Sequence, residues 1–397
     1  MKTLTRALFL SLVLGLAQPA LSHETKWRTL SEEAISLYKK GDYDRAVAAV
    51  KKSIAVAEKE YGANHPDTAT SLNNLAELYR GHSKYAEAEP LYKRALAIRE
   101  KFFGPRHSLV AMSLNGHAEL YRAQNRFTEA EPLYKRALAI REKSLRPDHP
   151  DMAQTMNNLA ELYCVQGEYR EAKPLYERSV AIREKVLGPQ HPGMATGLHN
   201  LGLIYQMESR YAQAEQLYKR VLAIREKSLG SGHPGVAQDL SNLAELYYAQ
   251  GQYALAVPLY SRALAIHEKL LGLDHPDVGH DLSRLAELHR VQGKHAEAQP
   301  FYRRSVAIFE KAGGSHRLNM ATSLSNLAFF HHTQGQYEQA EPLYKRALAI
   351  FETSGSADHP NAKLSLDNLA KLYRATDQSD IVGGTGRRVA GFSGVAE

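Results

Sequence analysis

The sequence is poor in the residues that support covalent cross-links and common catalytic motifs. Cys164 is the only cysteine in 397 residues, so no internal disulfide can form and stability has to come from packing. No Cys-x-x-Cys motif, nucleophile elbow or paired-carboxylate constellation accompanies it. The sequence therefore favours a protein that is not an enzyme, with no cofactor and no bound metal.

Long apolar runs and blocks of one charge are also missing. The longest apolar run, residues 7–17, is shorter than the roughly 18 apolar residues that a membrane helix needs. Lys and Arg number 50 against 43 Asp and Glu, a formal charge of +7, and basic residues alternate with Glu, as in Arg99-Glu100-Lys101. This alternation is typical of a solvated helix face, whereas a nucleic-acid binder concentrates its basic residues. We expect neither membrane insertion nor a nucleic-acid partner.

The first 22 residues have the pattern of a secretory signal peptide. Lys2 and Arg6 precede the apolar run, and Ala20-Leu21-Ser22 places small residues where a signal peptidase cleaves. We expect cleavage near Ser22. The sequence thus predicts an exported protein, located in the periplasm or outside the cell.

Self-similarity is the strongest feature of the sequence. The segment Asn-Leu-Ala-Glu-Leu-Tyr begins at Asn74, Asn158 and Asn242. A histidine opens each unit, at His65, His107, His149, His191, His233, His275, His316 and His359. The steps between these histidines are 42 residues, except for the last two of 41 and 43, and we expect the loop at Gly313-Gly314 to absorb that change.

Two apolar stripes with the spacing i, i+3, i+4, i+7 predict two helices in each unit. In the first full unit the stripes are Leu72, Leu75, Ala76 and Tyr79, then Ala88, Leu91, Tyr92 and Ala95. Small residues recur at the positions of Ala76 and Ala88, and a large ring recurs at the position of Tyr92. Small residues facing large ones allow antiparallel helices to interdigitate.

These motifs resemble the tetratricopeptide repeat. Its signature, Leu-x-x-Leu-Ala-x-x-Tyr, Gly-x-Tyr-x-x-Ala and Tyr-x-x-Ala, can be read from Leu72 to Ala95 and recurs over residues 65–375. The usual unit has about 34 residues, and the longer unit with His-Pro-Asp and Asn-Asn-Leu-Ala resembles the kinesin light chain class. The resemblance implies an all-α fold, a right-handed α-solenoid (superhelix) of helix-turn-helix repeats that acts as a protein-protein interaction scaffold. The motor role is not carried over, because no heptad segment is present and a leader precedes the repeats.

The leader pattern, the resemblance and the end of the repeat pattern together predict how the chain is divided. The expected segments are a signal peptide at 1–22, a divergent N-terminal helix pair at 23–64, seven repeats of 41–43 residues at 65–358, a capping helix at 359–376 and a disordered tail at 377–397.

By resemblance to tetratricopeptide peptide binders, three positions of the first helix line an inner groove. These positions hold Asn73, Glu77, Arg80, Asn115, Glu119, Arg122, Asn157, Glu161, His199, Leu203, Glu245, Glu287 and Arg290. An Asn row can bond the N–H and C=O groups of an extended peptide without selecting its sequence. The Glu and Arg residues either select charge or simply pair with each other.

The alignment with the tetratricopeptide repeat leads to predictions for two further sets of residues. The polar groove is interrupted in the fourth repeat by His199, Leu203, Gln206 and Met207. This interruption predicts a pocket for an apolar side chain, with relaxed constraint in this repeat as the alternative. A second Asn set is expected to face the adjacent repeat and bond loop carbonyls; it comprises Asn74, Asn158, Asn200, Asn242, Asn326 and Asn368.

The repeated His-Pro pair could suggest metal binding, because histidine is a common metal ligand. Each pair, however, is the only one in its loop. Pro suits the first helical position, and His or the following Asp can cap the helix, so we interpret these pairs as structural. Two alternative functions are considered. One is a self-assembling structural protein that forms homo-oligomers through its ends. The other is a metal-dependent enzyme that uses the histidines of the last repeats, His289, His295, His331 and His332.

Overall fold

The computed structural model of the protein describes residues 26–356 and 358–376. The predicted signal peptide at 1–22 and the predicted tail at 377–397 lie outside the described residues. All regular structure in the described part is helical, with no β-strand, so the prediction of an all-α fold is confirmed. The chain falls into two compact units, which meet at Ile204 and Tyr205 and are described separately below.

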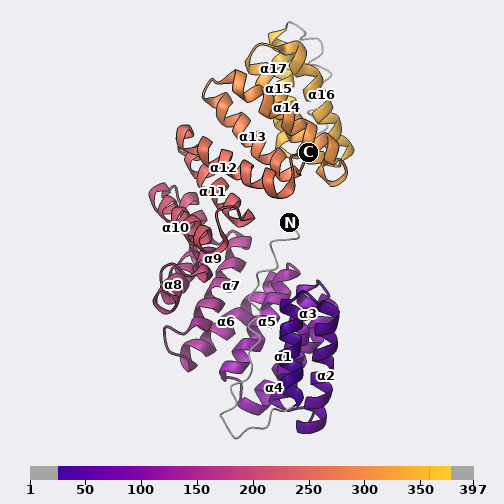
Figure 1. Ribbon diagram of the computed structural model, residues 1–397, viewed down its shortest axis with the longest axis vertical. Coiled ribbons are helices and arrows are strands. Elements are labelled where there is room, and N and C mark those ends of the chain that lie inside the picture. Colours follow the sequence, from indigo (N-terminus) through magenta and orange to yellow (C-terminus); the bar gives the residue numbers. More distant parts are fainter. Residues whose placement is uncertain (1–25, 357, 377–397) are drawn as a thin grey trace, which may run out of the picture. The chain divides into compact units, whose positions relative to one another are not determined.

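Unit 1 is a stack of helical hairpins (Figure 1). Its elements are α1 (Lys26–Lys39), α2 (Tyr43–Tyr61), α3 (Pro66–Gly81), α4 (Tyr85–Phe103), α5 (Ser108–Ala123), α6 (Phe127–Ser144), α7 (Pro150–Gln166), α8 (Tyr169–Leu187), the 3₁₀ turn η2 (Pro192–Met194) and most of α9 (Ala195–Met207). Each odd-numbered helix up to α7 packs along the helix that follows it, and each hairpin packs on the next.

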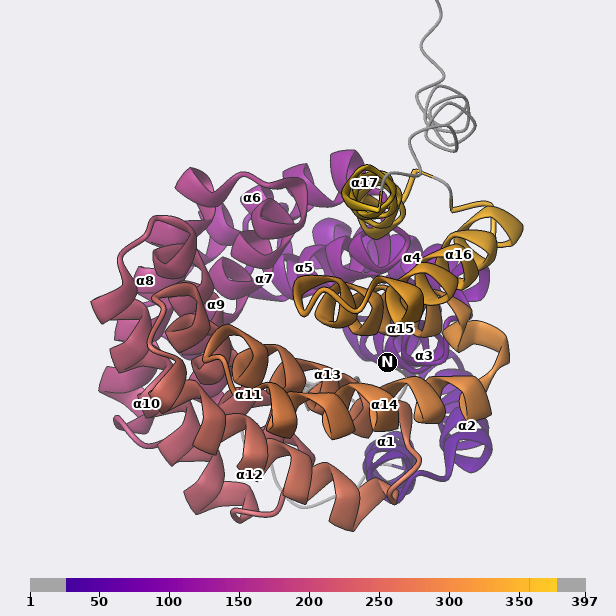
Figure 2. The ribbon, with the colours of Figure 1, turned by 90° about the horizontal axis from the view of Figure 1, so that it is seen from above.

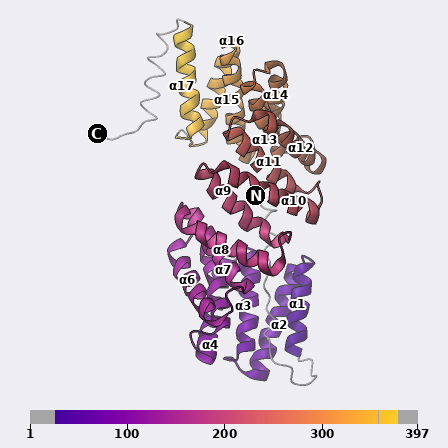
Figure 3. The ribbon, with the colours of Figure 1, turned by 90° about the vertical axis from the view of Figure 1, so that its left-hand side faces the viewer.

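Unit 2 repeats this arrangement up to its C-terminal helix. Its elements are α10 (Tyr211–Leu229), α11 (Pro234–Ala249), α12 (Tyr253–Leu271), α13 (Pro276–Val291), α14 (His295–Ala312), the 3₁₀ turn η3 (Gly314–His316), α15 (Arg317–Thr333), α16 (Tyr337–Thr353) and α17 (Pro360–Ala375). The last helix, α17, packs on both α15 and α16 (Figure 3).

The helices of each unit form two layers. In unit 1, α3 contacts α5 and α5 contacts α7; in unit 2, α13 contacts α15 and α15 contacts α17. Figure 2 shows α5 and α7 in one layer of unit 1, with α6 and α8 in the other. The first helices of successive hairpins therefore lie closer together than the second helices do, and we call the side that they form the first-helix face of each unit.

The repeated histidines start the first helices. His65, His107, His149, His191, His233, His275 and His359 each use Nδ1 to accept a hydrogen bond from the backbone N–H two residues later, at 3.0–3.2 Å. Six of them are followed by Pro at the first helical position. The interpretation of the His-Pro pairs as helix caps is confirmed, because an otherwise unpaired N–H is satisfied at each helix start.

His316 is the exception, and the structure explains the irregular spacing around it. The core leucines keep a step of 42 residues, from Leu282 to Leu324 and Leu366, so no residue is lost or gained between helices. Arg317 occupies the position that the other capping histidines hold, and His316 lies one residue earlier, without a side-chain cap bond. The expected change of loop length at Gly313-Gly314 is therefore wrong: only the histidine has moved.

Small and large side chains alternate across the helix contacts as the sequence predicts. Ala76, Ala88 and Tyr92 are completely buried, and the same holds for Ala118, Ala130 and Tyr134 in the next repeat. Each buried tyrosine ring fills the space left by the small residues of the neighbouring helix. Burying one such ring contributes about 1.5–3 kcal/mol to stability through the hydrophobic effect.

A periodic set of ion pairs joins the second helices on the outer side of each unit. An Arg of one second helix pairs with a Glu of the preceding one; these pairs are Arg94–Glu58, Arg136–Glu100 and Arg178–Glu142 in unit 1, and Arg262–Glu226, Arg304–Glu268 and Arg346–Glu310 in unit 2. Such half-exposed pairs contribute at most about 1 kcal/mol each. They neutralise these six arginines, while lysines of the second helices such as Lys227 and Lys269 are not part of this set.

Not every Arg of the charged pattern is solvated. Arg99, which the sequence analysis assigned to a solvated face, is only 1 % exposed. Its guanidinium donates to the Oγ1 of Thr70, the carbonyl oxygen of Leu109 and the Oγ of Ser113, and so ties α4 to α3 and α5. Burial lowers the pKa of Arg99 to about 10. The assignment was wrong because alternating charges do not reveal which Arg faces the next hairpin.

Candidate functional site

The candidate groove residues of unit 1 form a polar network that is mostly internal. The Arg80 guanidinium lies 2.7 Å from a carboxylate oxygen of Glu77 on the same helix and 3.1 Å from one of Glu119 on α5. Tyr92 Oη donates to Glu77 at 2.6 Å. The side chains of Arg80, Glu119 and Glu77 are 9 %, 11 % and 17 % exposed. These charges therefore stabilise the contact between hairpins rather than stand free for a ligand.

The pKa directions agree with this network. Burial lowers the pKa of Arg80, but the carboxylates of Glu77 and Glu119 outweigh it and hold the pKa above its ordinary value. Burial raises the pKa of Glu119, and Arg80 offsets part of that rise. Removing one member would leave the others buried without a partner, which is costly.

The Asn row of unit 1 is buried rather than presented to solvent. Asn73, Asn115 and Asn157 are 7 %, 9 % and 4 % exposed. The side-chain amides of Asn115 and Asn157 donate to Glu119 at 3.1 Å and Glu161 at 2.8 Å, one turn along the same helix. The Oδ1 atoms of Asn73 and Asn157 have no hydrogen-bond partner. Both atoms are buried as well as unpaired, so this row does not offer an extended peptide the open amide groups that the sequence predicts.

Two members of the second Asn set, Asn158 and Asn200, face the neighbouring repeat, but with partners other than those predicted. Asn158 donates to Glu119 at 2.6 Å, and Asn200 donates to the hydroxyl of Tyr176 at 2.9 Å. The expected loop carbonyls are thus replaced by side chains of the preceding hairpin. In α5 the equivalent residue is Gly116, where a Cβ would lie 2.8 Å from Glu77 Oε1, so glycine leaves room for the Glu77 network.

The remaining polar positions of unit 1 are more open. Arg122 and Glu161 lie on successive first helices, α5 and α7, with 3.7 Å between a guanidinium nitrogen and a carboxylate oxygen. About a quarter of each side chain is exposed. A pair of this kind is weak enough to be exchanged for a ligand charge.

In unit 2, Glu287, Arg290 and Tyr302 repeat the network of Glu77, Arg80 and Tyr92, with more exposed Glu and Arg side chains. Glu287 accepts hydrogen bonds from Arg290 at 2.6 and 2.8 Å and from the hydroxyl of Tyr302 at 2.7 Å. The Arg290 guanidinium also lies over the Phe329 ring, 5.0 Å from its centroid. Glu245 is 41 % exposed and pairs at 3.5 Å with Arg284, which is 57 % exposed. The first-helix face of unit 2 therefore offers charges that solvent, and hence a ligand, can reach.

The interruption in the fourth repeat is solvent-exposed. Leu203 is 41 % exposed on α9, and Val165, at the end of α7, is 60 % exposed. Met207, one turn after Leu203, is 58 % exposed. His199 is half-buried on the same helix. Exposed apolar side chains on an otherwise polar face mark a place where another molecule gains by covering them.

The histidines of the last repeats take part in packing contacts, and Cys164 is a free, half-buried cysteine. His331 is 3 % exposed, with its Nδ1 2.6 Å from Gln336 Oε1, and His289 and His332 contact aromatic rings. Across residues 26–356 and 358–376, no three His, Cys, Asp or Glu side chains come together as metal ligands. Burial raises the pKa of the Cys164 thiol, which lowers its reactivity at neutral pH. No helix among these residues is both long and apolar enough to cross a membrane.

The comparisons agree with this architecture. The tetratricopeptide repeat family model matches residues 28–101, 83–143, 109–164, 151–227, 194–269, 235–311 and 319–380. No curated protein matches the chain.

Three solved structures illustrate the similarity. The signal-transduction ATPase with a tetratricopeptide repeat sensor from Pyrococcus horikoshii has a TM-score of 0.65 and 16% identity, covering 92% of this chain and 53% of its own. BtubC (BKLC) from P. vanneervenii has a TM-score of 0.51 and 23% identity, covering 58% and 92%. TPR-like repeats described as a Podosopora anserina kinesin light chain have a TM-score of 0.45 and 29% identity, covering 53% and 99%.

The matched segments run almost without interruption from the first described helix to the last. The helical hairpins, their buried alanines and tyrosines and their 42-residue step agree with this assignment. The chain therefore belongs to the tetratricopeptide repeat family, as a solenoid of kinesin light chain-like repeats.

Proposed function

We propose that this chain is a protein-interaction scaffold that binds segments of other polypeptides along its first-helix faces, in the periplasm or outside the cell. The observation that carries the proposal is the exposed apolar surface of Leu203 and Val165 on a face that is otherwise polar and internally paired. A partner side chain that covers these residues removes apolar area from water, at roughly 25 cal/mol per Å². Binding to a preformed helical surface also costs little ordering on the side of the scaffold.

The polar residues would have divided roles in this function. Glu77, Arg80 and Glu119 are committed to one another, so they hold the surface in shape and discriminate little between ligands. The exposed Arg284 and Glu245 of unit 2 are available to pair with ligand charges. Asn73 and Asn157 are buried, so they support the shape of the first-helix face and do not contact a ligand backbone directly. Recognition would then combine an apolar anchor with weak, sequence-tolerant polar contacts.

The functional test uses exposed residues, so that folding is preserved. Leu203→Asp in unit 1 and Arg284→Glu in unit 2 change the first-helix faces, whereas Leu255→Asp changes a 50 % exposed leucine on the second helix α12. Partners crosslinked to the native protein in intact cells are identified and quantified by mass spectrometry. We expect Leu203→Asp to lose specific partners that Leu255→Asp retains. Equal recovery with all variants would reject the first-helix face as the binding surface.

The location needs its own measurement. Export is proposed from the leader pattern of residues 1–22 alone. The N-terminal residue of the protein purified from its native cells should lie near His23, and the protein should be recovered outside the cytoplasm. An intact Met1 on cytoplasmic protein would refute the location and leave the binding proposal standing.

A further inference from the structure

The corner between α12 and α13 is the most apolar exposed loop of unit 2. Within residues 270–273, Leu270, Leu271 and Leu273 are 47 %, 39 % and 61 % exposed. At the equivalent corner of the preceding repeat, Ser228 stands in place of Leu270 and Ser231 in place of Leu273. The extra leucines are not needed for the hairpin, because that repeat forms the same hairpin without them. Clustered exposed leucines of this kind mark an interaction site.

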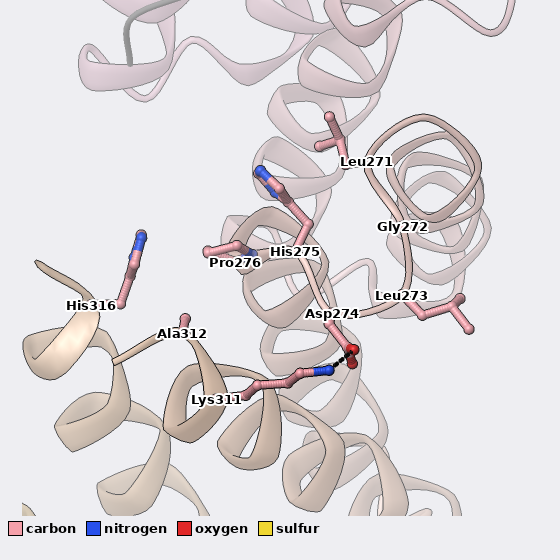
Figure 4. A pocket seen from close by; sticks show the side chains of 9 residues that line it. All are labelled: Leu271, Gly272, Leu273, Asp274, His275, Pro276, Lys311, Ala312 and His316. Carbon is pink, nitrogen blue, oxygen red and sulfur yellow. Dashed lines mark hydrogen bonds and ion pairs between the residues drawn. The ribbon is translucent and has the colours of Figure 1, made fainter. Parts of the chain in front are cut away.

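A surface hollow of about 530 Å³ lies beside these leucines. Figure 4 shows Leu271, Leu273, His275 and Pro276 along one part of it, with Lys311, Ala312 and His316 across from them. The hollow has a local cause in the sequence. Ala312, which lines the hollow, and Gly313 stand where α12, one repeat earlier, has Leu270 and Leu271, so small residues replace two leucines here.

The charge at this corner is positive. Lys227 lies in the last turn of α10, and Lys269 lies in the last turn of α12. Arg317 is the first residue of α15. Of the nearby carboxylates, Asp274 pairs with Lys311 (Figure 4), while Glu226 and Glu268 pair with Arg262 and Arg304. Lys269, which directly precedes Leu270, is therefore not paired with any of these carboxylates, and Lys227 holds the same position one repeat earlier. Asp277 lies 3.6 Å from the His275 ring at the helix start.

We propose that this corner docks on an anionic phospholipid surface, with Leu270, Leu271 and Leu273 at the acyl boundary and Lys227 and Lys269 among the headgroup phosphates. Apolar side chains flanked by lysines are the arrangement by which a folded protein binds an anionic lipid interface without spanning it. The hollow beside Lys311 gives a headgroup room to approach. The corner connects the second helix α12 to the first helix α13.

The test is cosedimentation of the full chain with vesicles. Vesicles of equal parts phosphatidylcholine and phosphatidylglycerol are compared with vesicles of phosphatidylcholine alone. The variant is Leu270→Asp with Leu273→Asp, and the matched control is Leu255→Asp, an equally exposed leucine at the opposite end of α12. Any contribution of residues 1–25 is common to all three proteins and cancels in the comparison.

The native protein and the Leu255→Asp control should bind the anionic vesicles, and the double variant should bind about tenfold more weakly. Lys227→Gln with Lys269→Gln should weaken binding to anionic vesicles and reduce its dependence on salt. Equal binding of the double variant and the control would overturn the proposal. So would absence of binding by the native protein, or a double variant that only shifts a dimer to a monomer in light scattering, which would identify a second copy as the occupant.

Discussion

His117 makes the stability of unit 1 sensitive to acid. Its side chain is 4 % exposed on α5, both ring nitrogens lack hydrogen-bond partners, and its ring packs against those of Tyr92 and Tyr121. Every other repeat has leucine at this position: Leu75, Leu159, Leu201, Leu243, Leu285, Leu327 and Leu369. A histidine therefore occupies a site that the fold shapes for an aliphatic side chain.

Burial lowers the pKa of His117 from 6.5 to about 4, and Glu89 opposes this shift while Lys93 and Arg126 add to it. Because the folded pKa is depressed, the unfolded chain binds the proton more readily. The contribution of neutral His117 to the free energy of unfolding is therefore fully present above pH 6.5. It is lost as the pH falls toward the pKa of His117 in the folded protein. Linkage with these two pKa values gives a loss of about 2 kcal/mol at pH 5 and about 3 kcal/mol at pH 4.

The assay is urea unfolding of the native protein and of His117→Leu, followed by far-ultraviolet circular dichroism at neutral pH and at pH 5. The other titrating groups are common to both proteins, so only the difference between them is interpreted. At neutral pH the leucine variant should be more stable by about 1–2 kcal/mol, because two unpaired polar atoms leave the core. At about pH 5 the gap should widen by a further 2 kcal/mol. An unchanged gap would refute the assignment of a buried neutral histidine.

Three further predictions concern the contacts that join the repeats. His107→Ala should lower stability by about 1 kcal/mol through loss of a helix cap, whereas His316→Ala, at a histidine without a cap bond, should leave thermal unfolding unchanged; equal effects would contradict the cap assignment. Arg225→Leu should cost about 3–5 kcal/mol in urea unfolding because it leaves the buried Asp239 unpaired, and Asp239→Asn in the same chain should recover part of that loss. Tyr92→Phe removes the hydrogen bond to Glu77 and should cost about 1–2 kcal/mol in the same measurement, while Tyr61→Phe, at an exposed ring, should be neutral.

The repeat and its helices could be predicted because they depend on local patterns. The 3.6-residue spacing of Leu72, Leu75 and Tyr79 selects helix and its buried face. The position of His65 before Pro66 selects the helix start. The same pattern recurs in every repeat. A helix assignment in one repeat is therefore supported by the equivalent segments of the others.

The solvent exposure of the predicted groove side chains could not be predicted from the sequence. It depends on how closely the first helices of successive hairpins pack. The repeat pattern assigned Asn115 and Glu119 to the groove side of the helix, and it could not show that Asn158 of the next hairpin donates a hydrogen bond to Glu119. The buried Arg99 was missed for a similar reason. A signal was available, however: the residues at the same position in later repeats are Phe309 and Phe351, which indicates a buried site.

The measurement that tests the central claim most directly is site-specific photocrosslinking in the native cells. A photoreactive amino acid is placed at Leu203, on the exposed apolar part of the first-helix face, and separately at Leu255, equally exposed on a second helix. The account predicts that discrete polypeptides are captured at residue 203 and not at residue 255. Capture of the same polypeptides at both positions, or at residue 255 alone, would contradict it.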